Sequence, residues 1–184
     1  MVIFKQLFPG FWLLLVANLL LLSCSSSKKS ISIPDAPIDG QPSTSLQKKY
    51  AALIGVPTTS ITNNTLYSFI DKWLNTSYQY GSQNDKGIDC SGFTQMLFDA
   101  VYKKKLPRTS EAQYAAISAF TNTRNLVEGD LVFFTTIKGK KISHVGIYLQ
   151  NNRFVNATNK GVAISDMGIS YWKEKFVGAG RIRD

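Results

Sequence analysis

GIDCSGF (residues 87–93) is the stretch on which the prediction of the fold rests. It holds Cys90, the only cysteine that follows position 24, with Asp89 before it and Ser91 after it. The apolar residues that come next recur at the spacing of one face of an amphipathic helix; they are Phe93, Met96, Leu97, Ala100 and Val101. The spacing therefore predicts a helix that begins at or just after Cys90 and ends at the lysine triplet 103–105.

The predicted position of Cys90 bears on its chemistry. A lone cysteine is commonly a small buried apolar residue. At the first turn of a helix, however, unpaired N–H groups and the helix dipole lower the pKa of a thiol. Gly92 also leaves room for another chain to approach. The local sequence thus favours a reactive thiol over a structural one.

The rest of the chain divides into helices first and strands second. An apolar face over Leu66–Leu74 predicts a helix capped by Asn63 or Asn64, and Ser110–Gln113 fits a capping box in which Ser110 caps a short helix. Alternating apolar runs predict five strands, which are residues 130–136, 144–150, 153–158, 162–165 and 176–183. This order predicts an α+β domain in which N-terminal helices pack on a largely antiparallel sheet.

The first 45 residues are not expected to belong to that domain. Residues 1–23 have one positive charge and a short apolar run, as a signal peptide does, and the sequence from Leu21 to Cys24 resembles a bacterial lipobox. Cys24 would then carry a lipid, and the Ser- and Pro-rich residues 24–45 would form a flexible tether. The catalytic domain is expected over residues 46–184. Lipidation of Cys24 leaves Cys90 without a disulfide partner in a monomer, which flags Cys90 as a free thiol.

Composition excludes several classes of protein. The net charge of +9 comes from 21 Lys and Arg against 12 Asp and Glu, but the basic residues are scattered and no nucleic-acid-binding motif occurs. One histidine and no paired cysteines leave no zinc site, so no metal or organic cofactor is expected. The chemistry that remains is a nucleophilic cysteine with a base, and His144, the only histidine, supplies one at the start of a predicted strand.

The motifs together resemble the NlpC family of bacterial cell-wall cysteine endopeptidases, which includes Spr-type lipoproteins. The resemblance covers residues 66–184 and rests on motifs that keep the family's order and spacing; they are YxxG, GIDCSGF, LPRTS, LVEGDLVFF, HVGIYLQNNRFVNAT and GVAIS. It implies a compact papain-like fold with Cys90 as nucleophile and His144 as base. It also implies that Asn156 is the third polar residue and that Tyr78 stands near the nucleophile. The usual Pro-Tyr-x-x-Gly-Gly is changed here, since residues 77–82 read SYQYGS.

The resemblance further implies what the protein does and where. It predicts cleavage of amide bonds in peptidoglycan stem peptides or cross-links, with Asp89 and Ser91 recognising the stem peptide. It implies a monomer anchored through Cys24 in the bacterial cell envelope, at the outer membrane facing the periplasm, without a nucleic-acid partner. Asp89 and Ser91 could instead only cap the helix, and Arg108 is interpreted as a solvated surface charge.

The hairpin between the second and third predicted strands gives a geometric criterion for the triad. Strand residues alternate between faces, so a two-residue turn at Asn151–Asn152 would place His144 and Asn156 on opposite faces. A three-residue loop over 150–152 places them on one face as diagonal neighbours. We therefore predict the three-residue loop, with Asn152 in the left-handed conformation that asparagine tolerates.

Two other functions remain open from the sequence. A papain-like acyltransferase or amidase would use the same Cys90 and His144 on a different acyl substrate. An anchored, non-catalytic binding protein could keep the fold, although loss of the cysteine or the histidine would be its mark and both are present. A transferred acyl product would favour the first alternative over hydrolysis.

Overall fold

The computed structural model describes residues 44–182 of the 184-residue chain. The predicted signal peptide, the lipidation site Cys24 and nearly all of the predicted tether lie outside the described residues. The first described helix begins at Thr44, within two residues of the expected start of the domain at Leu46. No helix among the described residues has the length and apolar character that crossing a membrane requires.

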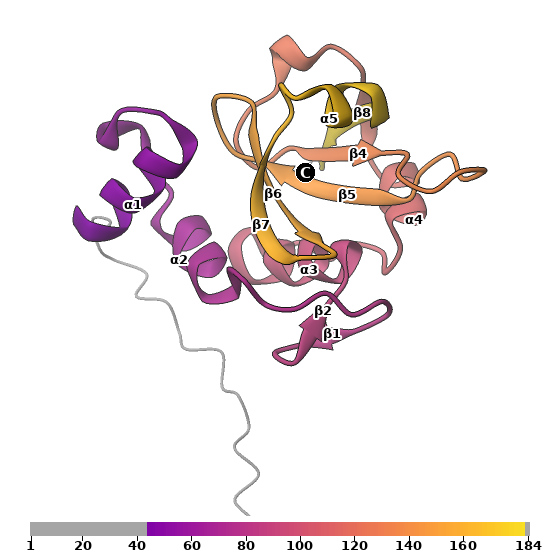
Figure 1. The fold of residues 1–184 in the computed structure, drawn as a ribbon, viewed down its shortest axis with the longest axis horizontal. Helices are drawn as coiled ribbons and strands as arrows, with labels where there is room; N and C mark the ends of the chain where they lie inside the picture. The colour runs from indigo at the N-terminus through magenta and orange to yellow at the C-terminus, as the bar shows by residue number, and fades with distance from the viewer. Residues whose placement is uncertain (1–43, 183–184) are drawn as a thin grey trace, which may run out of the picture. The chain divides into compact units, whose positions relative to one another are not determined.

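The described residues form two parts in chain order, as predicted: a helical first half and a sheet in the second half (Figure 1). The helices are α1 (Thr44–Ile54), α2 (Asn64–Trp73), α3 (Cys90–Leu97), α4 (Ser110–Ala115) and α5 (Ser170–Lys175). Short 3-10 turns cover Thr58–Ser60 and Thr123–Asn125, and a π-helical turn, Phe98–Tyr102, continues α3. Lys103, in the left-handed conformation (φ 57°), ends that continuation at the lysine triplet as expected.

The main sheet has six strands in the order β3-β8-β4-β5-β6-β7, and each neighbouring pair is antiparallel. The strands are β3 (Ser118–Phe120), β4 (Leu131–Phe134), β5 (His144–Tyr148), β6 (Arg153–Thr158), β7 (Gly161–Asp166) and β8 (Phe176–Arg181). A small hairpin, β1 (Gln83–Asn84) with β2 (Gly87–Ile88), precedes α3. The predicted α+β class with a largely antiparallel sheet is confirmed.

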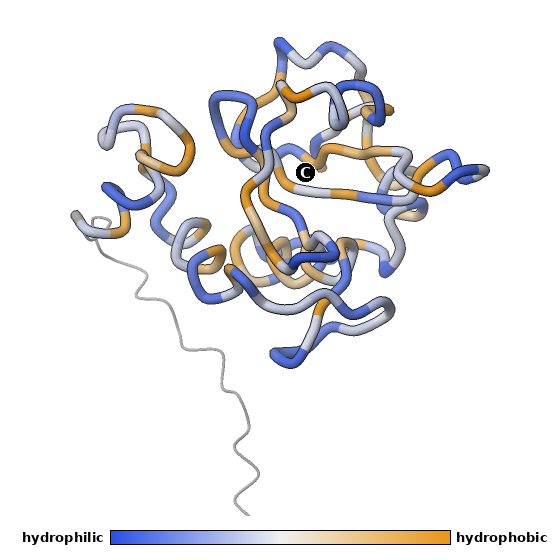
Figure 2. The backbone as a smooth tube through the Cα atoms, viewed as in Figure 1, coloured by the Kyte–Doolittle hydropathy of each residue, from blue (hydrophilic) through white to orange (hydrophobic). Residues whose placement is uncertain are grey.

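The two faces of the sheet bury different cores. On one face, Val145 and Ile147 of β5 pack with Phe93 and Leu97 of α3 in the larger core. Figure 2 shows apolar segments concentrated in β4, β5 and α3, with hydrophilic loops around them. The other face carries a smaller core that is mainly aromatic and is closed by α5; it contains Val132, Phe134, Tyr148, Phe154, Met167, Trp172 and Ala179. His144 alternates with Val145 and therefore lies on this second face.

Some local features differ from the sequence prediction. The N-cap of α4 is Thr109, whose hydroxyl accepts a hydrogen bond from the Ala112 N–H at 3.2 Å, so the prediction of Ser110 as the cap is wrong by one residue. Asn63 caps α2 by accepting from the Leu66 N–H at 3.0 Å, which settles the choice between Asn63 and Asn64. The sequence interpretation missed α1, the β1–β2 hairpin, β3 and α5. The hairpin strands, β3 and α5 are too short to show a period, whereas α1 spans 11 residues.

Candidate active site

The N-terminus of α3 is fixed by the carboxylate of Asp89. As the N-cap, Asp89 accepts from the Gly92 N–H at 2.7 Å, and its second oxygen accepts from the Gly81 N–H at 2.8 Å. Arg108 donates to both carboxylate oxygens, from Nη1 at 2.9 Å and from Nη2 at 2.8 Å. The same Nη1 donates to Ser91 Oγ at 3.0 Å. The interpretation of Arg108 as a solvated charge is therefore wrong, since its guanidinium is bound in a bidentate ion pair.

The electrostatics of Asp89 follow from these contacts. Burial alone would raise the pKa of the carboxyl, because Asp89 is only 5% exposed. Hydrogen bonds from Arg108, Gly92 and Gly81 outweigh burial and hold its pKa below the usual value of 3.8. Asp89 is thus a charged helix cap at neutral pH, and its oxygens are occupied by protein donors.

A second polar side chain, that of Gln113, also stabilises the first turn of α3. Gln113 is fully buried and donates from Nε2 to the carbonyl oxygens of Ser91 (3.0 Å) and Pro107 (2.9 Å). Its Oε1 accepts from the Thr94 hydroxyl at 2.8 Å. Gln113 therefore ties α3 to the segment that carries Arg108. The sequence signal for Gln113 was the capping-box pattern, which identified the residue but gave it the wrong partner.

Cys90 lies at the first residue of α3 and faces the start of β5. It is 7% exposed, and its sulfur accepts hydrogen bonds from the backbone N–H groups of Val145 and Ser91. Burial raises the pKa of the thiol, and these N–H groups lower it by less. The expected lowering at the helix N-terminus is therefore present as a contribution, but the prediction of a net lowering is wrong, because burial outweighs it.

The β5–β6 hairpin has the register that the triad requires. Ile147 pairs with Val155 and Tyr148 pairs with Phe154, which closes a three-residue loop over 150–152. The prediction of Asn152 in the left-handed conformation is confirmed (φ 58°), and Asn151 adopts it too (φ 48°). The alternative two-residue turn is thereby excluded.

This register places Asn156 on the same face as His144. Asn156 lies opposite Gly146, where a Cβ atom would stand 3.1 Å from the Cβ of Asn156 and 2.6 Å from Cδ2 of Phe154. A larger residue at 146 would clash with that ring, so the glycine allows β6 to approach β5 beside His144. The predicted arrangement of His144 and Asn156 as diagonal neighbours on one face is confirmed.

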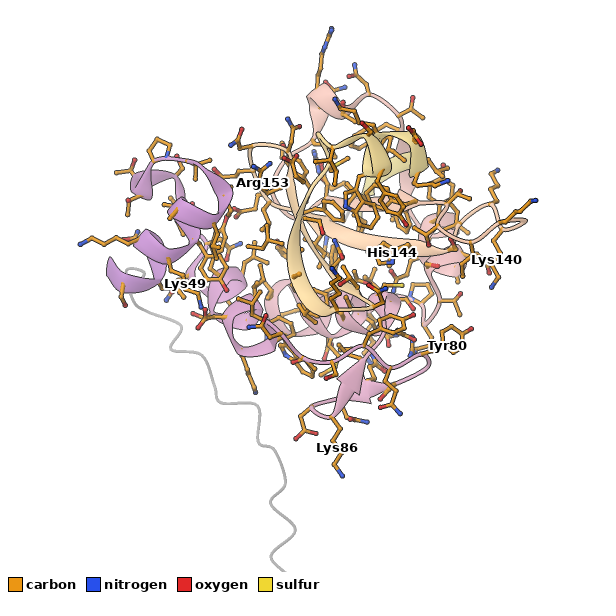
Figure 3. The ribbon with its side chains drawn as sticks, viewed as in Figure 1. Lys49, Tyr80, Lys86, Lys140, His144 and Arg153 are labelled. Atoms are coloured by element: carbon orange, nitrogen blue, oxygen red, sulfur yellow. The ribbon has the colours of Figure 1, made fainter. Side chains whose placement is uncertain are left out.

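His144 is 8% exposed, at the start of β5 (Figure 3). Burial lowers the pKa of its imidazole to about 4, and the neighbouring Asn156 amide offsets only part of that effect. Within residues 44–182, His144 Nε2 and both polar atoms of the Asn156 amide are buried without a hydrogen bond of normal geometry. The Asn156 amide is thus close enough to raise the pKa of the imidazole by hydrogen bonding, although the contact falls short of normal hydrogen-bond geometry.

Cys90 contacts the residue that directly follows His144, at the point where β5 and β6 diverge. The two strands pair only at their loop-proximal ends, at 147 with 155 and 148 with 154. Beyond them the Val145 N–H bonds to the Cys90 sulfur instead of a strand partner. Since Val145 directly follows His144, the imidazole and the thiol flank one peptide unit. With a raised thiol pKa and an imidazole pKa of about 4, both groups are uncharged at neutral pH.

Tyr78 lies beside the nucleophile. Residues 77–79 run parallel to Ile88, with the Ile88 N–H donating to the Ser77 oxygen at 3.0 Å and the Gln79 N–H to the Ile88 oxygen at 3.3 Å. Burial raises the pKa of Tyr78, and the charges of Cys90, once its thiol is ionised, and of Asp89 raise it further. The ring is 37% exposed. The structure thus places Tyr78 close enough to Cys90 and Asp89 for their charges to act on its hydroxyl.

The same geometry limits the chemistry available. Across residues 44–182, no group of three or more His, Cys, Asp or Glu side chains is placed to hold a metal ion. What the site offers is a thiol, an imidazole, an amide and backbone N–H groups at a helix start. A helix-borne cysteine set against a strand-borne histidine, in a helical half packed on an antiparallel sheet, defines a papain-like cysteine peptidase fold.

Comparison with known proteins identifies the family. The NlpC/P60 family matches residues 75–181, and the chain belongs to it. It is 36% identical over 173 residues to a probable endopeptidase NlpC of Escherichia coli strain K12, covering 94% of this chain and 99% of that protein. It is 34% identical over 166 residues to the murein DD-endopeptidase MepS/murein LD-carboxypeptidase of the same strain, covering 89% of this chain and 86% of that protein.

A solved structure agrees with this assignment. A crystal structure of an NLP/P60-family protein, described as similar to lipoprotein, from Staphylococcus aureus is 31% identical and superposes with a TM-score of 0.59. The match covers 64% of this chain and 40% of the staphylococcal chain. The comparison therefore concerns the catalytic domain and not the remainder of that longer protein.

Proposed function

We propose that this protein is a cell-wall hydrolase, a cysteine endopeptidase that cleaves amide bonds in peptidoglycan stem peptides or cross-links. Membership of the NlpC/P60 family and relatives named as peptidoglycan and murein endopeptidases support this class of activity. The observation that carries the proposal is the placement of Cys90 at the start of α3, bonded to the peptide N–H that follows His144.

The reaction starts from a neutral pair. As the Cys90 sulfur attacks the carbonyl carbon, the thiol proton passes to the His144 imidazole, so a C–S bond forms while the S–H bond breaks. The Cys90 backbone N–H and the Tyr78 hydroxyl stabilise the oxyanion. The imidazolium then protonates the leaving amine, and the C–N bond breaks to leave an acyl-enzyme. His144 next takes a proton from water, which attacks the acyl carbon; the C–S bond then breaks, and the imidazolium returns the proton to the Cys90 sulfur, which restores the neutral pair.

Asn156 and the Asp89 turn have supporting roles in this proposal. The Asn156 amide oxygen accepts from the imidazole once the ring is protonated, which satisfies an atom that is otherwise unpartnered among the described residues. Asp89 sets the helix N-terminus, and together with Ser91 it faces the stem peptide. Asp89 is already bound to Arg108, so a substrate amine would add to an existing ion pair.

We also propose where the domain acts. A lipid on Cys24 would anchor a monomer, and residues 24–45 would let the domain reach the wall. The relatives' named substrates support the bacterial envelope as the location. The specific assignment to the outer membrane, facing the periplasm, rests on the resemblance to Spr-type lipoproteins, whereas the lipobox-like sequence before Cys24 supports the lipid anchor itself.

The two cysteines of the chain provide a matched test. Purified peptidoglycan is digested with the full-length wild type, with Cys90→Ala and with Cys24→Ala in detergent, and the fragments are identified by mass spectrometry. Cys90→Ala is expected to lower cleavage by at least about a thousandfold, because it removes the nucleophile. Cys24→Ala is expected to release the wild-type fragments.

Two results would contradict the proposal. Identical fragments from wild type and Cys90→Ala would show that another residue is the nucleophile. A new acylated product in place of released stem-peptide fragments would indicate acyl transfer instead of hydrolysis.

A further inference from the structure

No hydrogen bond of normal geometry holds the His144 ring at Nε2 among the described residues. This atom is buried and unpartnered among residues 44–182, and so are both polar atoms of the Asn156 amide. A catalytic base must nevertheless keep a fixed plane, because misplacement of a reacting group by about 1 Å can cost on the order of a hundredfold in rate. The aromatic residues of the smaller core are the other neighbours that can supply this constraint.

Trp172 of α5 stacks on the imidazole. The two ring centroids lie 5.4 Å apart with an interplanar angle of 24°. Phe134 also approaches His144, but at 6.2 Å and with a tilt of 48°. Trp172 is therefore the aromatic neighbour whose face is nearly parallel to the imidazole.

Trp172 is itself fixed on several sides. Its ring meets Phe134 at 4.7 Å and 60°, Phe154 at 5.0 Å and 89°, and Tyr171 at 4.9 Å and 78°. The residue is 9% exposed. Edge contacts from three rings leave one indole orientation, so the plane presented to His144 is set by packing.

The same residue borders open space. Trp172 lines a cavity of about 350 Å³ with Met167 and Phe176 among its other walls. Trp172 thus contacts the imidazole and also lines this cavity, whereas His144 is not among the residues that line it. A smaller side chain at this position would open a path to the imidazole.

We propose that Trp172 is a positioning residue for the proposed peptidase reaction, fixing the plane of the His144 imidazole and shielding the ring face on which it stacks from water. The inference rests on the proposed function, in which His144 is the base. It assigns a role to α5, an element that contributes none of the residues that react.

A dry imidazole stays neutral and ready to accept the thiol proton. The groups around His144 are the thiol of Cys90 beyond the Val145 peptide, the Asn156 amide on β6, and the rings of Phe134 and Trp172. Among the described residues no charged side chain contributes to the pKa of His144, which burial lowers to about 4. Removing the indole therefore raises that pKa toward the ordinary 6.5 by admitting water.

The test compares Trp172→Leu, which removes the ring, with Trp172→Phe, which keeps a smaller one. Phe176→Leu is the matched control, because Phe176 lines the same cavity and contacts Phe134 but is not stacked on His144. The chain has a single histidine, so untagged full-length protein gives one imidazole C2–H signal to titrate by NMR. Stability is measured by thermal unfolding, and kcat and KM are measured against pH.

For Trp172→Leu we expect kcat to fall about tenfold or more with KM changed by less than about twofold, because orientation of the base is lost. The imidazole signal should lose its upfield ring-current shift, and its titration midpoint should rise. The acid limb of activity should move up by the same amount. Trp172→Phe should restore most of kcat, and Phe176→Leu should keep the wild-type midpoint while losing stability.

An imidazole signal and midpoint unchanged in Trp172→Leu would overturn the proposal and leave Trp172 as a core residue. If Trp172→Leu does not fold, Trp172→Phe decides, since a smaller ring must raise the midpoint above that of the wild type. The NMR titration does not depend on cleavage. A wild type that cleaves no peptidoglycan but shows the predicted spectral changes would therefore reject the proposed function and not the stacking role.

Discussion

The two ends of the candidate site are held in place by different kinds of interaction. At the nucleophile end, the Asp89 carboxylate accepts from Gly81, Gly92 and Arg108, and every bond is between 2.7 and 2.9 Å. At the base end, polar atoms of His144 and Asn156 are buried without partners among the described residues. Charge-assisted hydrogen bonds fix the helix that carries the thiol, whereas aromatic packing fixes the imidazole.

Despite this difference, burial sets the protonation state of the reactive group at both ends. The polar network at the nucleophile end acts on the helix start and leaves the sulfur itself buried, so the pKa of the Cys90 thiol is raised. The aromatic surroundings of His144 lower its pKa to about 4. Both shifts have burial as the largest cause, and both favour the neutral form. Cys90 is therefore a neutral thiol in the substrate-free site.

Breaking the ion pair at the nucleophile end is expected to have the largest effect on stability. Arg108→Met leaves the Asp89 carboxylate, whose side chain is 7% exposed, without its cation. We expect a loss of about 2–3 kcal/mol at neutral pH, below the full value for a buried pair because Arg108 is 36% exposed. Urea unfolding of the full chain measures this loss.

The stability difference between Arg108→Met and the wild type should depend on pH, in a direction that follows from the pKa of Asp89. The folded-state pKa of Asp89 lies below 3.8 in the wild type, so its stabilisation is present above that value and is lost as the pH falls through the folded pKa. In Arg108→Met, the guanidinium that lowers the pKa of Asp89 is missing, so the raising effect of burial is less opposed and that pKa rises. The stability gap to wild type should therefore narrow below about pH 4. Asp89→Asn, which can still cap Gly92, should cost less, and an equal cost at neutral pH and in acid for Arg108→Met would contradict the ion-pair account.

At the base end, removing a polar group should have the opposite effect on stability. Asn156 is fully buried, and neither polar atom of its amide makes a hydrogen bond of normal geometry in the described structure. Asn156→Leu is expected to raise stability by up to about 1 kcal/mol, because an unsatisfied amide is replaced by an apolar group of similar volume. The same change should lower kcat by about tenfold or more, because the imidazolium loses its acceptor.

Thr158→Val is the matched control for that prediction. Thr158 lies on the same strand and face, and its hydroxyl is satisfied by the Gly161 oxygen at 2.9 Å. We expect this variant to lose about 1 kcal/mol of folding stability, because an existing hydrogen bond is removed. It should keep its activity, because that bond lies away from the Cys90 thiol. A loss of stability in Asn156→Leu as large as that in Thr158→Val would show that the Asn156 amide is satisfied in solution.

The sequence predicted those features that depend on local spacing. The start of α3 at Cys90, the hairpin loop over 150–152 and the shared face of His144 and Asn156 follow from periodicity and from the alternation of strand residues. Each of these depends on residues that are close in the chain. The resemblance to the family added the roles proposed for Asn156 and Tyr78.

What the sequence did not predict depends on partners distant in the chain. Arg108 meets Asp89 across 19 positions, and Trp172 reaches His144 from a helix of six residues that has no visible period. The net pKa shift of Cys90 also needed the structure, because a helix N-terminus can be recognised from sequence whereas the extent of burial cannot.

The smallest expected effects concern the hairpin loop over residues 150–152. The backbone of this loop fixes the strand register that places His144 and Asn156 on one face. Asn151 and Asn152 are both left-handed. The Asn151 side chain donates to the Ile54 and Gly55 oxygens at 2.9 and 3.1 Å, whereas no side-chain hydrogen bond of Asn152 is present among residues 44–182. Glycine adopts this backbone conformation freely.

We therefore expect Asn152→Gly to change stability by no more than a few tenths of a kcal/mol, and Asn151→Gly to lose about 1 kcal/mol despite its favourable backbone. Both variants should keep the wild-type kcat, because the register of His144 and Asn156 depends on loop length and not on these two amides. Thermal unfolding and peptidoglycan cleavage measure the two effects. A larger loss for Asn152→Gly than for Asn151→Gly, or a fall in kcat for either, would mean that the asparagine side chains themselves hold the base in register.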